Sequence, residues 1–166
     1  MGEPFAQMPM DGWMAARVLM SLFCGTIVGL ERQIRGKPVG IRTSVLITVS
    51  TMAFIQLGNL GNSTQATDPT RVLGQLVTGV GFLGAGVILT RNGAIEGVTS
   101  AACIWLLSAV GAAIGFDQFR FAMLLSVIAV SVLIGVEWLE RAFFWLRQGV
   151  HAHGDERSPQ SKDRDV

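Results

Sequence analysis

The glycine spacing Gly79-x-Gly81-x-x-Gly84 matches the fingerprint of loops that bind the pyrophosphate of a dinucleotide. In those loops the glycines lie between a strand and a helix, and an acidic residue follows about 20 positions later. Here the motif lies inside an uncharged apolar run from Val72 to Thr90, and alanine and cysteine occupy the region around position 101. This context excludes nucleotide binding, and we expect no cofactor.

A few polar side chains beside the apolar runs are the other candidates for chemistry. Glu31 follows the first run and Arg42 lies near the start of the second, so we expect similar membrane depths and an ion pair. Arg71 and Gln75 are four residues apart and share a helix face, which extends a polar stripe into the third run. Arg17 and Arg42 also fit side chains that snorkel to the membrane interface.

Combinations of catalytic residues are missing from the apolar runs. None contains His, which excludes a zinc metalloprotease helix and a Ser–His dyad. None has Asp or Glu at its middle, which excludes an aspartyl dyad, and the chain has no Walker loop. Cys24 and Cys103 lie inside apolar runs, where we expect buried hydrophobic side chains. The sequence therefore predicts a protein that is not an enzyme and has no metal site.

Five apolar runs carry or flank these residues. Half of the 166 residues are hydrophobic and only 15% are charged, which is unusual for a soluble domain. A helix needs about 20 mostly apolar residues to cross a bilayer. The runs cover residues 13–30, 39–60, 72–90, 98–116 and 121–136. We predict an all-α, polytopic membrane protein, a bundle of five transmembrane helices with glycine-rich packing faces over residues 13–136.

The basic residues are distributed unevenly between the two sides of this predicted bundle. Ten of the 13 Lys and Arg residues follow the first, third and fifth runs or begin the second. The other three are Arg17, Arg71 and Arg120. Because Lys and Arg accumulate in cytoplasmic loops, we expect the N-terminus outside and the C-terminus in the cytoplasm.

The segments around the runs have their own signatures. We expect residues 1–12 to form an external N-terminal segment, and the Gly-, Asn-, Ser- and Thr-rich residues 59–69 predict an exposed loop. The short spacer 117–120 predicts an antiparallel helical hairpin. Residues 137–149 predict an amphipathic juxtamembrane helix, and residues 150–166 predict a disordered cytoplasmic tail.

Glycines spaced four apart occur in two runs, as Gly25-x-x-x-Gly29 in the first and Gly111-x-x-x-Gly115 in the fourth. This spacing lets two helix backbones approach closely. We expect packing grooves within the bundle, with a dimer or partner face as the alternative.

The third run is richer still in glycine. Its densest part contains Gly79, Gly81, Gly84 and Gly86. A glycine in a helix interior costs about 1 kcal/mol relative to alanine, so this segment indicates either close helix approach or a local break that lines a polar cavity.

The order and spacing of these segments resemble the MgtC/SapB family over about residues 13–136. The matching segments are Gly29–Gln33, Gly40–Thr43, Asp68–Arg71 with Gln75, Gly79–Ile88, and Gly97–Ala102 with Trp105. The resemblance implies multi-pass proteins of the bacterial inner membrane with an external N-terminus, in agreement with the charge distribution. It also adds Thr43, Thr99 and Trp105 to the polar functional candidates.

The best-known members of that family support growth in low magnesium and survival inside macrophages, and are thought to inhibit the F-type ATP synthase. The resemblance thus implies a non-enzymatic regulator that contacts a membrane partner through its helices, with the F-type ATP synthase as the candidate. The alternative is a component of a transporter or channel for magnesium or another cation. We also expect contact with the lipid bilayer, a possible homo-oligomer and no nucleic acid partner.

Two departures from the family pattern bear on this expectation. Longer members carry a soluble C-terminal ACT-like domain, which we expect this chain to lack. The family's Arg-Thr-His reads Arg42-Thr43-Ser44 here, so an imidazole role at that position is not expected.

Overall fold

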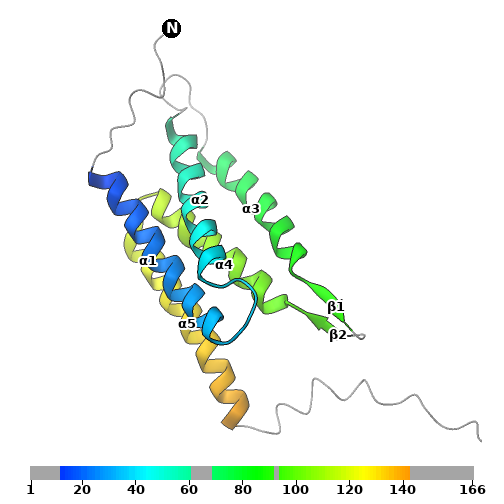
Figure 1. Ribbon diagram of the computed structural model, residues 1–166. Coiled ribbons are helices and arrows are strands. Elements are labelled where there is room, and N and C mark those ends of the chain that lie inside the picture. Colours follow the sequence, from blue (N-terminus) through cyan, green and yellow to red (C-terminus); the bar gives the residue numbers. More distant parts are fainter. Residues whose placement is uncertain (1–11, 61–68, 92–93, 143–166) are drawn as a thin grey trace, which may run out of the picture. The chain divides into compact units, whose positions relative to one another are not determined.

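The computed structural model describes residues 12–60, 69–91 and 94–142. The described residues form five helices and one small antiparallel hairpin (Figure 1). The elements are α1 (Gly12–Ile34), α2 (Ile41–Leu60), α3 (Pro69–Gly86), β1 (Leu89–Arg91), β2 (Ala94–Glu96), α4 (Val98–Gly115) and α5 (Phe119–Ala142). Helices α1, α2, α4 and α5 are long and apolar enough to cross a membrane. The predicted helical membrane fold is thereby confirmed.

The chain forms two compact units, Met1–Ser131 and Val132–Val166. The boundary falls inside α5, so the first unit contains α1 to α4, the hairpin and the first half of α5. The packing described below is that of the first unit.

Helix α2 packs against both α1 and α4, and glycines make these two contacts close (Figure 1). A Cβ atom added at Gly29 of α1 would lie 2.6 Å from the Cα of Ile41, and one added at Gly111 of α4 would lie 2.5 Å from the carbonyl oxygen of Thr48. Real Cβ atoms do not approach other atoms so closely. Gly25 and Gly115 make similar approaches one helical turn away. Both four-residue glycine motifs therefore pack against α2 within the chain.

The face of α2 between those two helices carries small hydroxyl side chains. Ser44 and Thr48 are fully buried, and Thr51 is 4% exposed. Thr48 Oγ1 donates to the carbonyl oxygen of Ser44 at 2.8 Å, and Thr51 Oγ1 lies 3.1 Å from Ser108 Oγ of α4. These hydrogen bonds satisfy buried polar groups that are costly to leave unpaired. Gly25, Gly29 and Gly111 thus approach α2 beside small hydroxyl residues, whereas Gly115 approaches Met52 and Ile55.

The third run does not remain helical to Thr90, which corrects its predicted end. Helix α3 stops at Gly86, and Leu89–Arg91 pairs with Ala94–Glu96 in an antiparallel hairpin. Glycine weakens the end of α3, and the β-branched residues that follow favour an extended strand. Gly97 closes the hairpin with φ +93°, and a Cβ atom there would collide with the carbonyl oxygen of Val87. Only glycine fits that position without strain.

Two polar contacts hold the end of the bundle where α4 turns into α5. Asp117 adopts φ +60° in this turn, and its carboxylate accepts two hydrogen bonds from Arg17 of α1, at 2.8 and 3.0 Å. Gln56 Nε2 of α2 donates to the carbonyl oxygen of Gly115 at 2.5 Å, which satisfies one of the free carbonyls at the end of α4. Arg17 therefore forms an ion pair within the chain. The sequence left its role open, with a side chain that snorkels to the interface as one interpretation.

Helix α5 is continuous from Phe119 to Ala142, so it includes the first residues of the predicted juxtamembrane helix. The rest of that helix, the external N-terminal segment up to residue 11, most of the predicted 59–69 loop and the predicted tail lie outside the described residues. The predicted topology of the termini stays a prediction.

Candidate functional site

A groove of about 510 Å³ lies between α2, α3 and α4. We call it the α3 groove. Its polar lining consists of Ser50 and Thr51 of α2, Gln75 of α3 and Ser108 of α4. The remaining lining is apolar, with Phe54 the largest side chain, and Gly79 contributes bare backbone from α3. Such a surface suits an apolar helix, because a few hydroxyl and amide groups fix its position while the rest supplies contact area.

The glycines of α3 differ from those of α1 and α4. A Cβ atom added at Gly79, Gly81 or Gly86 would meet no atom within 4 Å. At Gly84 it would meet Ala101 of α4 at 3.7 Å, which is ordinary van der Waals contact. Three of these four glycines therefore make no close helix approach within the described residues, and their role in contact with a partner stays a prediction. Gly79 and Gly86 are seven residues apart and leave bare backbone on one face of α3, whereas Gly81 lies on the opposite face.

The aromatic candidate Trp105 lies on α4 beside α3. It is 51% exposed and lines a smaller cavity of about 110 Å³ together with Thr51, Ser108 and apolar residues of α3. Thr51 and Ser108 border both this cavity and the α3 groove. The threonine candidates Thr43 and Thr99 are exposed and line neither cavity.

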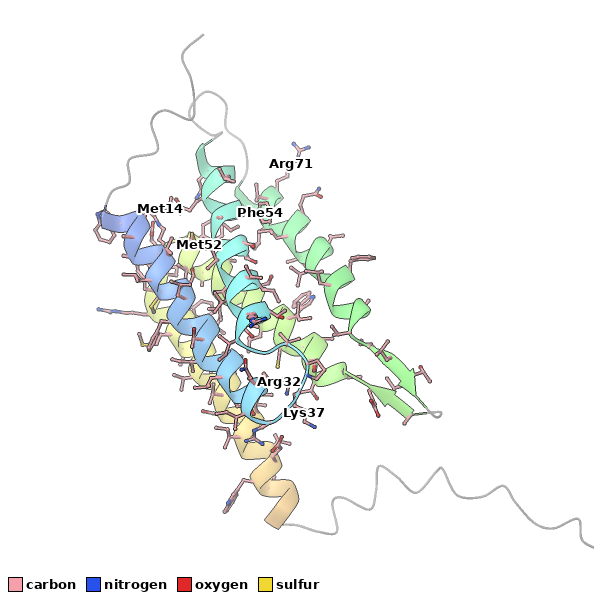
Figure 2. All side chains as sticks on the ribbon, in the orientation of Figure 1. Met14, Arg32, Lys37, Met52, Phe54 and Arg71 are labelled. Atoms are coloured by element: carbon pink, nitrogen blue, oxygen red, sulfur yellow. The ribbon has the colours of Figure 1, made fainter. Side chains whose placement is uncertain are left out.

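The predicted polar stripe of α3 separates into two environments. Gln75 lines the α3 groove. Arg71 is exposed and points away from the helices, at the end of the bundle opposite to Arg32 (Figure 2). The stripe therefore brings an amide into the groove, whereas the guanidinium is exposed and is not part of the groove lining.

The expected ion pair of Glu31 with Arg42 is not formed. Helix α1 continues to Ile34, and Glu31 Oε1 lies 2.5 Å from Nε of Arg35, one helical turn later. Arg42 lies in the first turn of α2 and is exposed. Residues four apart on one helix lie close together without any alignment between two helices. This explains why Glu31 pairs with Arg35 and not with Arg42.

The structure also reveals a buried polar cluster that the sequence did not single out, the α1/α4 polar cluster of Glu31, Arg32, Arg35 and Ser100. Arg32 is only 3% exposed, and its Nη2 donates to Ser100 Oγ at 2.6 Å. Its Nε has no acceptor, and neither carboxylate oxygen of Glu31 accepts a hydrogen bond in good geometry. The segments Gly29–Gln33 and Gly97–Ala102 were both recognised, but Arg32 was interpreted only as a charge of the predicted cytoplasmic loop.

Comparisons with known proteins place the chain among membrane proteins of one family. The model of the MgtC family matches residues 18–142. The chain is 42% identical over 122 residues to "Putative magnesium transporter YhiD" of Escherichia coli (strain K12), which covers 70% of the chain and 56% of that protein. It is 35% identical over 118 residues to "Protein MgtC" of Salmonella typhimurium (strain LT2), which covers 70% and 49%.

A further relative has a similar length. The chain is 31% identical over 155 residues to "Protein SrpB" of Synechococcus elongatus, which covers 85% of each protein. The chain spans about half the length of YhiD and MgtC. No solved structure matches.

Proposed function

This chain belongs to the MgtC family, and on that premise we propose that it is a non-enzymatic regulator of the bacterial inner membrane that binds another membrane protein through its helices. It is a multi-pass membrane protein with four helices long and apolar enough to span. The bias of Lys and Arg along the sequence supports an external N-terminus and a cytoplasmic C-terminus. The longer relatives' activities are carried over only as part of this proposal.

The observation that carries the proposal is the open backbone of α3 at Gly79, which lines the α3 groove. Helices associate in lipid mainly through close packing, and small residues permit the closest backbone approach. In this chain Gly79 has free space around it, and the groove that it lines is apolar apart from a few hydroxyl and amide groups. A transmembrane helix of a partner is the occupant that this combination favours.

The partner we propose is the membrane sector of the F-type ATP synthase. The family resemblance is the ground for this choice, and the apolar lining of the groove is compatible with a helix from that sector. Binding there would restrain proton flow through the synthase and thereby lower its rate without any chemistry by the regulator. A relative's name links the family to magnesium, and growth in low magnesium is the condition in which we expect this regulation to matter.

The test uses inverted membrane vesicles that contain the synthase, with and without this chain, and measures ATP-driven proton pumping. The wild-type chain is expected to reduce pumping, and Gly79→Leu is expected to abolish the reduction, because leucine fills the space in the groove that the partner helix needs. Gly135→Leu of α5 is the matched control, since a Cβ atom there also meets nothing within 4 Å. Unchanged pumping with the wild-type chain, or equal effects of both variants, contradicts the proposal.

A second function, magnesium transport, is favoured by the oxygen-bearing side chains in the groove. Ser50, Thr51, Gln75 and Ser108 are all neutral, whereas Mg²⁺ is usually held through carboxylates and its own waters. We therefore expect no magnesium uptake above that of empty liposomes when the purified chain is reconstituted alone. Saturable uptake that is lost in Gln75→Leu would replace the regulator with a transporter.

A further inference from the structure

The α1/α4 polar cluster contains more positive than negative charge in a buried place. Arg32 is 3% exposed and Glu31 is 8% exposed. The carboxylate of Glu31 forms its ion pair with Arg35, which leaves the guanidinium of Arg32 with a hydroxyl, Ser100 Oγ, as its hydrogen-bond acceptor. Burying a charge is expensive unless an opposite charge and hydrogen bonds compensate it. Within the described residues, neither ion pair includes Arg32, so no opposite charge gives it that compensation.

The element that faces Arg32 makes this imbalance larger. Ser100 is the third residue of α4, an 18-residue helix whose N-cap, Gly97, makes no side-chain capping hydrogen bond. The backbone N–H of Ala101 donates to the carbonyl oxygen of Gly97, so the N–H groups of the three residues before it are the ones that a helix leaves unpaired. The start of a helix also carries a partial positive charge. A buried guanidinium therefore points at the positive end of a helix dipole.

These groups are the elements of an oxyanion site. Free backbone N–H groups at a helix start bind phosphate and sulfate readily, and Arg adds a charge-assisted donor. Arg32 Nε is a buried donor without an acceptor, as such a site would need. Lys37 lies exposed near Arg32 at the same end of the bundle and extends the positive field toward solvent (Figure 2).

Glu31 adds selectivity to this site. Its Oε2 is buried and has no donor, and an ionised carboxylate can only accept hydrogen bonds. A ligand that reaches both Arg32 and Glu31 must accept from the first and donate to the second. The protonated oxygen of inorganic phosphate or of a phosphate monoester does both near neutral pH, whereas sulfate and the phosphodiester of a lipid carry no proton to donate.

We infer that the α1/α4 polar cluster binds a protonated phosphate group, with Arg32 and the first turn of α4 as donors and Glu31 as the acceptor of the phosphate proton. The site is separate from the α3 groove, whose lining includes none of these residues. The phosphate site can therefore be tested independently of the proposed partner contact.

The first measurement is binding of radiolabelled inorganic phosphate to the full chain, purified in a maltoside detergent, by equilibrium dialysis at pH 7. We expect saturable binding that sulfate displaces at least tenfold less effectively than phosphate. Arg32→Gln is expected to raise Kd at least tenfold, while Arg120→Gln, an exposed cation next to the α4–α5 turn, leaves it unchanged. Glu31→Gln is expected to remove the preference for phosphate over sulfate, since an amide can donate to either anion.

A second pair of variants keeps the test decisive if Arg32→Gln does not fold. Ser100→Asp places a carboxylate where Arg32 now finds a hydroxyl, and Ser100→Asn has the same shape without the charge. Without phosphate, Ser100→Asp is expected to have a higher Tm than Ser100→Asn. Its Tm is expected to be indifferent to phosphate, while that of the wild-type chain rises with phosphate concentration.

Three results would overturn the inference. The first is a wild-type Tm that changes equally with phosphate, sulfate and chloride at one ionic strength. The second is a lower Tm for Ser100→Asp than for Ser100→Asn. The third is a rise in the wild-type Tm with short-chain phosphatidylglycerol but not with phosphate. The last result would assign the cluster to a lipid headgroup.

Discussion

The glycines of α1 and α4 and those of α3 have opposite surroundings. Gly29 and Gly111 lie so close to α2 that a single methyl group would collide with its backbone, whereas Gly79, Gly81 and Gly86 have open space. The first set is needed for helix packing within the folded chain. The second set has no such use within the chain, although each of its members weakens α3. The contrast teaches that a small-residue motif acquires its role from what lies opposite, which the motif itself does not specify.

The largest expected effect comes from filling the two kinds of site with leucine. Gly111→Leu places a branched side chain where even Cβ would lie 2.5 Å from the Thr48 carbonyl oxygen, so we expect no folded protein in detergent. Gly81→Leu is expected to fold and to insert normally. Size-exclusion profiles and thermal unfolding of the two purified variants measure the difference. Equal behaviour of the two would break the contrast between the sets.

The next effect concerns Gly97, which lies after the hairpin and combines both constraints. Its φ of +93° and its contact with Val87 make alanine unfavourable in backbone conformation and in space. We expect Gly97→Ala to lower the free energy of unfolding by about 2 kcal/mol, within the range for a strained backbone position. Gly86→Ala, eleven residues earlier and open, is the control. A loss of stability in the control alone would show that the hairpin tolerates a side chain at Gly97.

Alanine at the open glycines is expected to have the opposite sign. Gly79→Ala and Gly81→Ala add a methyl group that meets no atom within 4 Å and remove the conformational freedom of glycine from the middle of α3. We expect each to raise the free energy of unfolding by about 0.5–1 kcal/mol. Denaturant titration of the purified variants measures this gain. Destabilisation by either change would mean that α3 packs more closely in the folded chain than the contrast requires.

The sequence was sufficient for the fold because its signals were local. The five apolar runs predicted the five helices, of which four among the described residues are long and apolar enough to span a membrane, and the turn at Asp117 followed from the short polar spacer. The end of α3 was missed because Val87–Thr90 is as apolar as the helix before it, and only pairing with Ala94–Glu96 makes a strand there favourable. Composition indicates whether a segment lies in the membrane or in water better than it indicates whether the segment is a helix or a strand.

The candidate site was less accessible from the sequence, because its contacts depend on which helix faces which. Glu31 was paired with Arg42 on the basis of depth, but depth leaves the rotation of α2 undetermined, and Arg42 is exposed. Arg32 was counted among loop charges because apolar residues end at Leu30, yet α1 continues one turn further and buries it against Ser100. The resemblance included the segments Gly29–Gln33 and Gly97–Ala102, and the packing showed that Arg32 and Ser100 are the residues that meet.

The arginines repeat the contrast between committed and open residues and yield the smallest expected effect. Arg17 is committed to a two-bond pair with Asp117, with side-chain exposures of 16% and 48%, while Arg42 is exposed. Double-mutant cycles separate the two cases, since interacting residues show a coupling energy and independent ones do not. For Arg17→Gln with Asp117→Asn we expect a coupling of about 0.5–1 kcal/mol, because solvent screens a partly exposed pair. For Glu31→Gln with Arg42→Gln the effects on unfolding free energy should add, because Glu31 lies against Arg35 instead. Coupling in the second cycle that equals or exceeds the first would place Arg42 in the buried cluster, and it would remove the distinction between committed and open side chains at that end of the bundle.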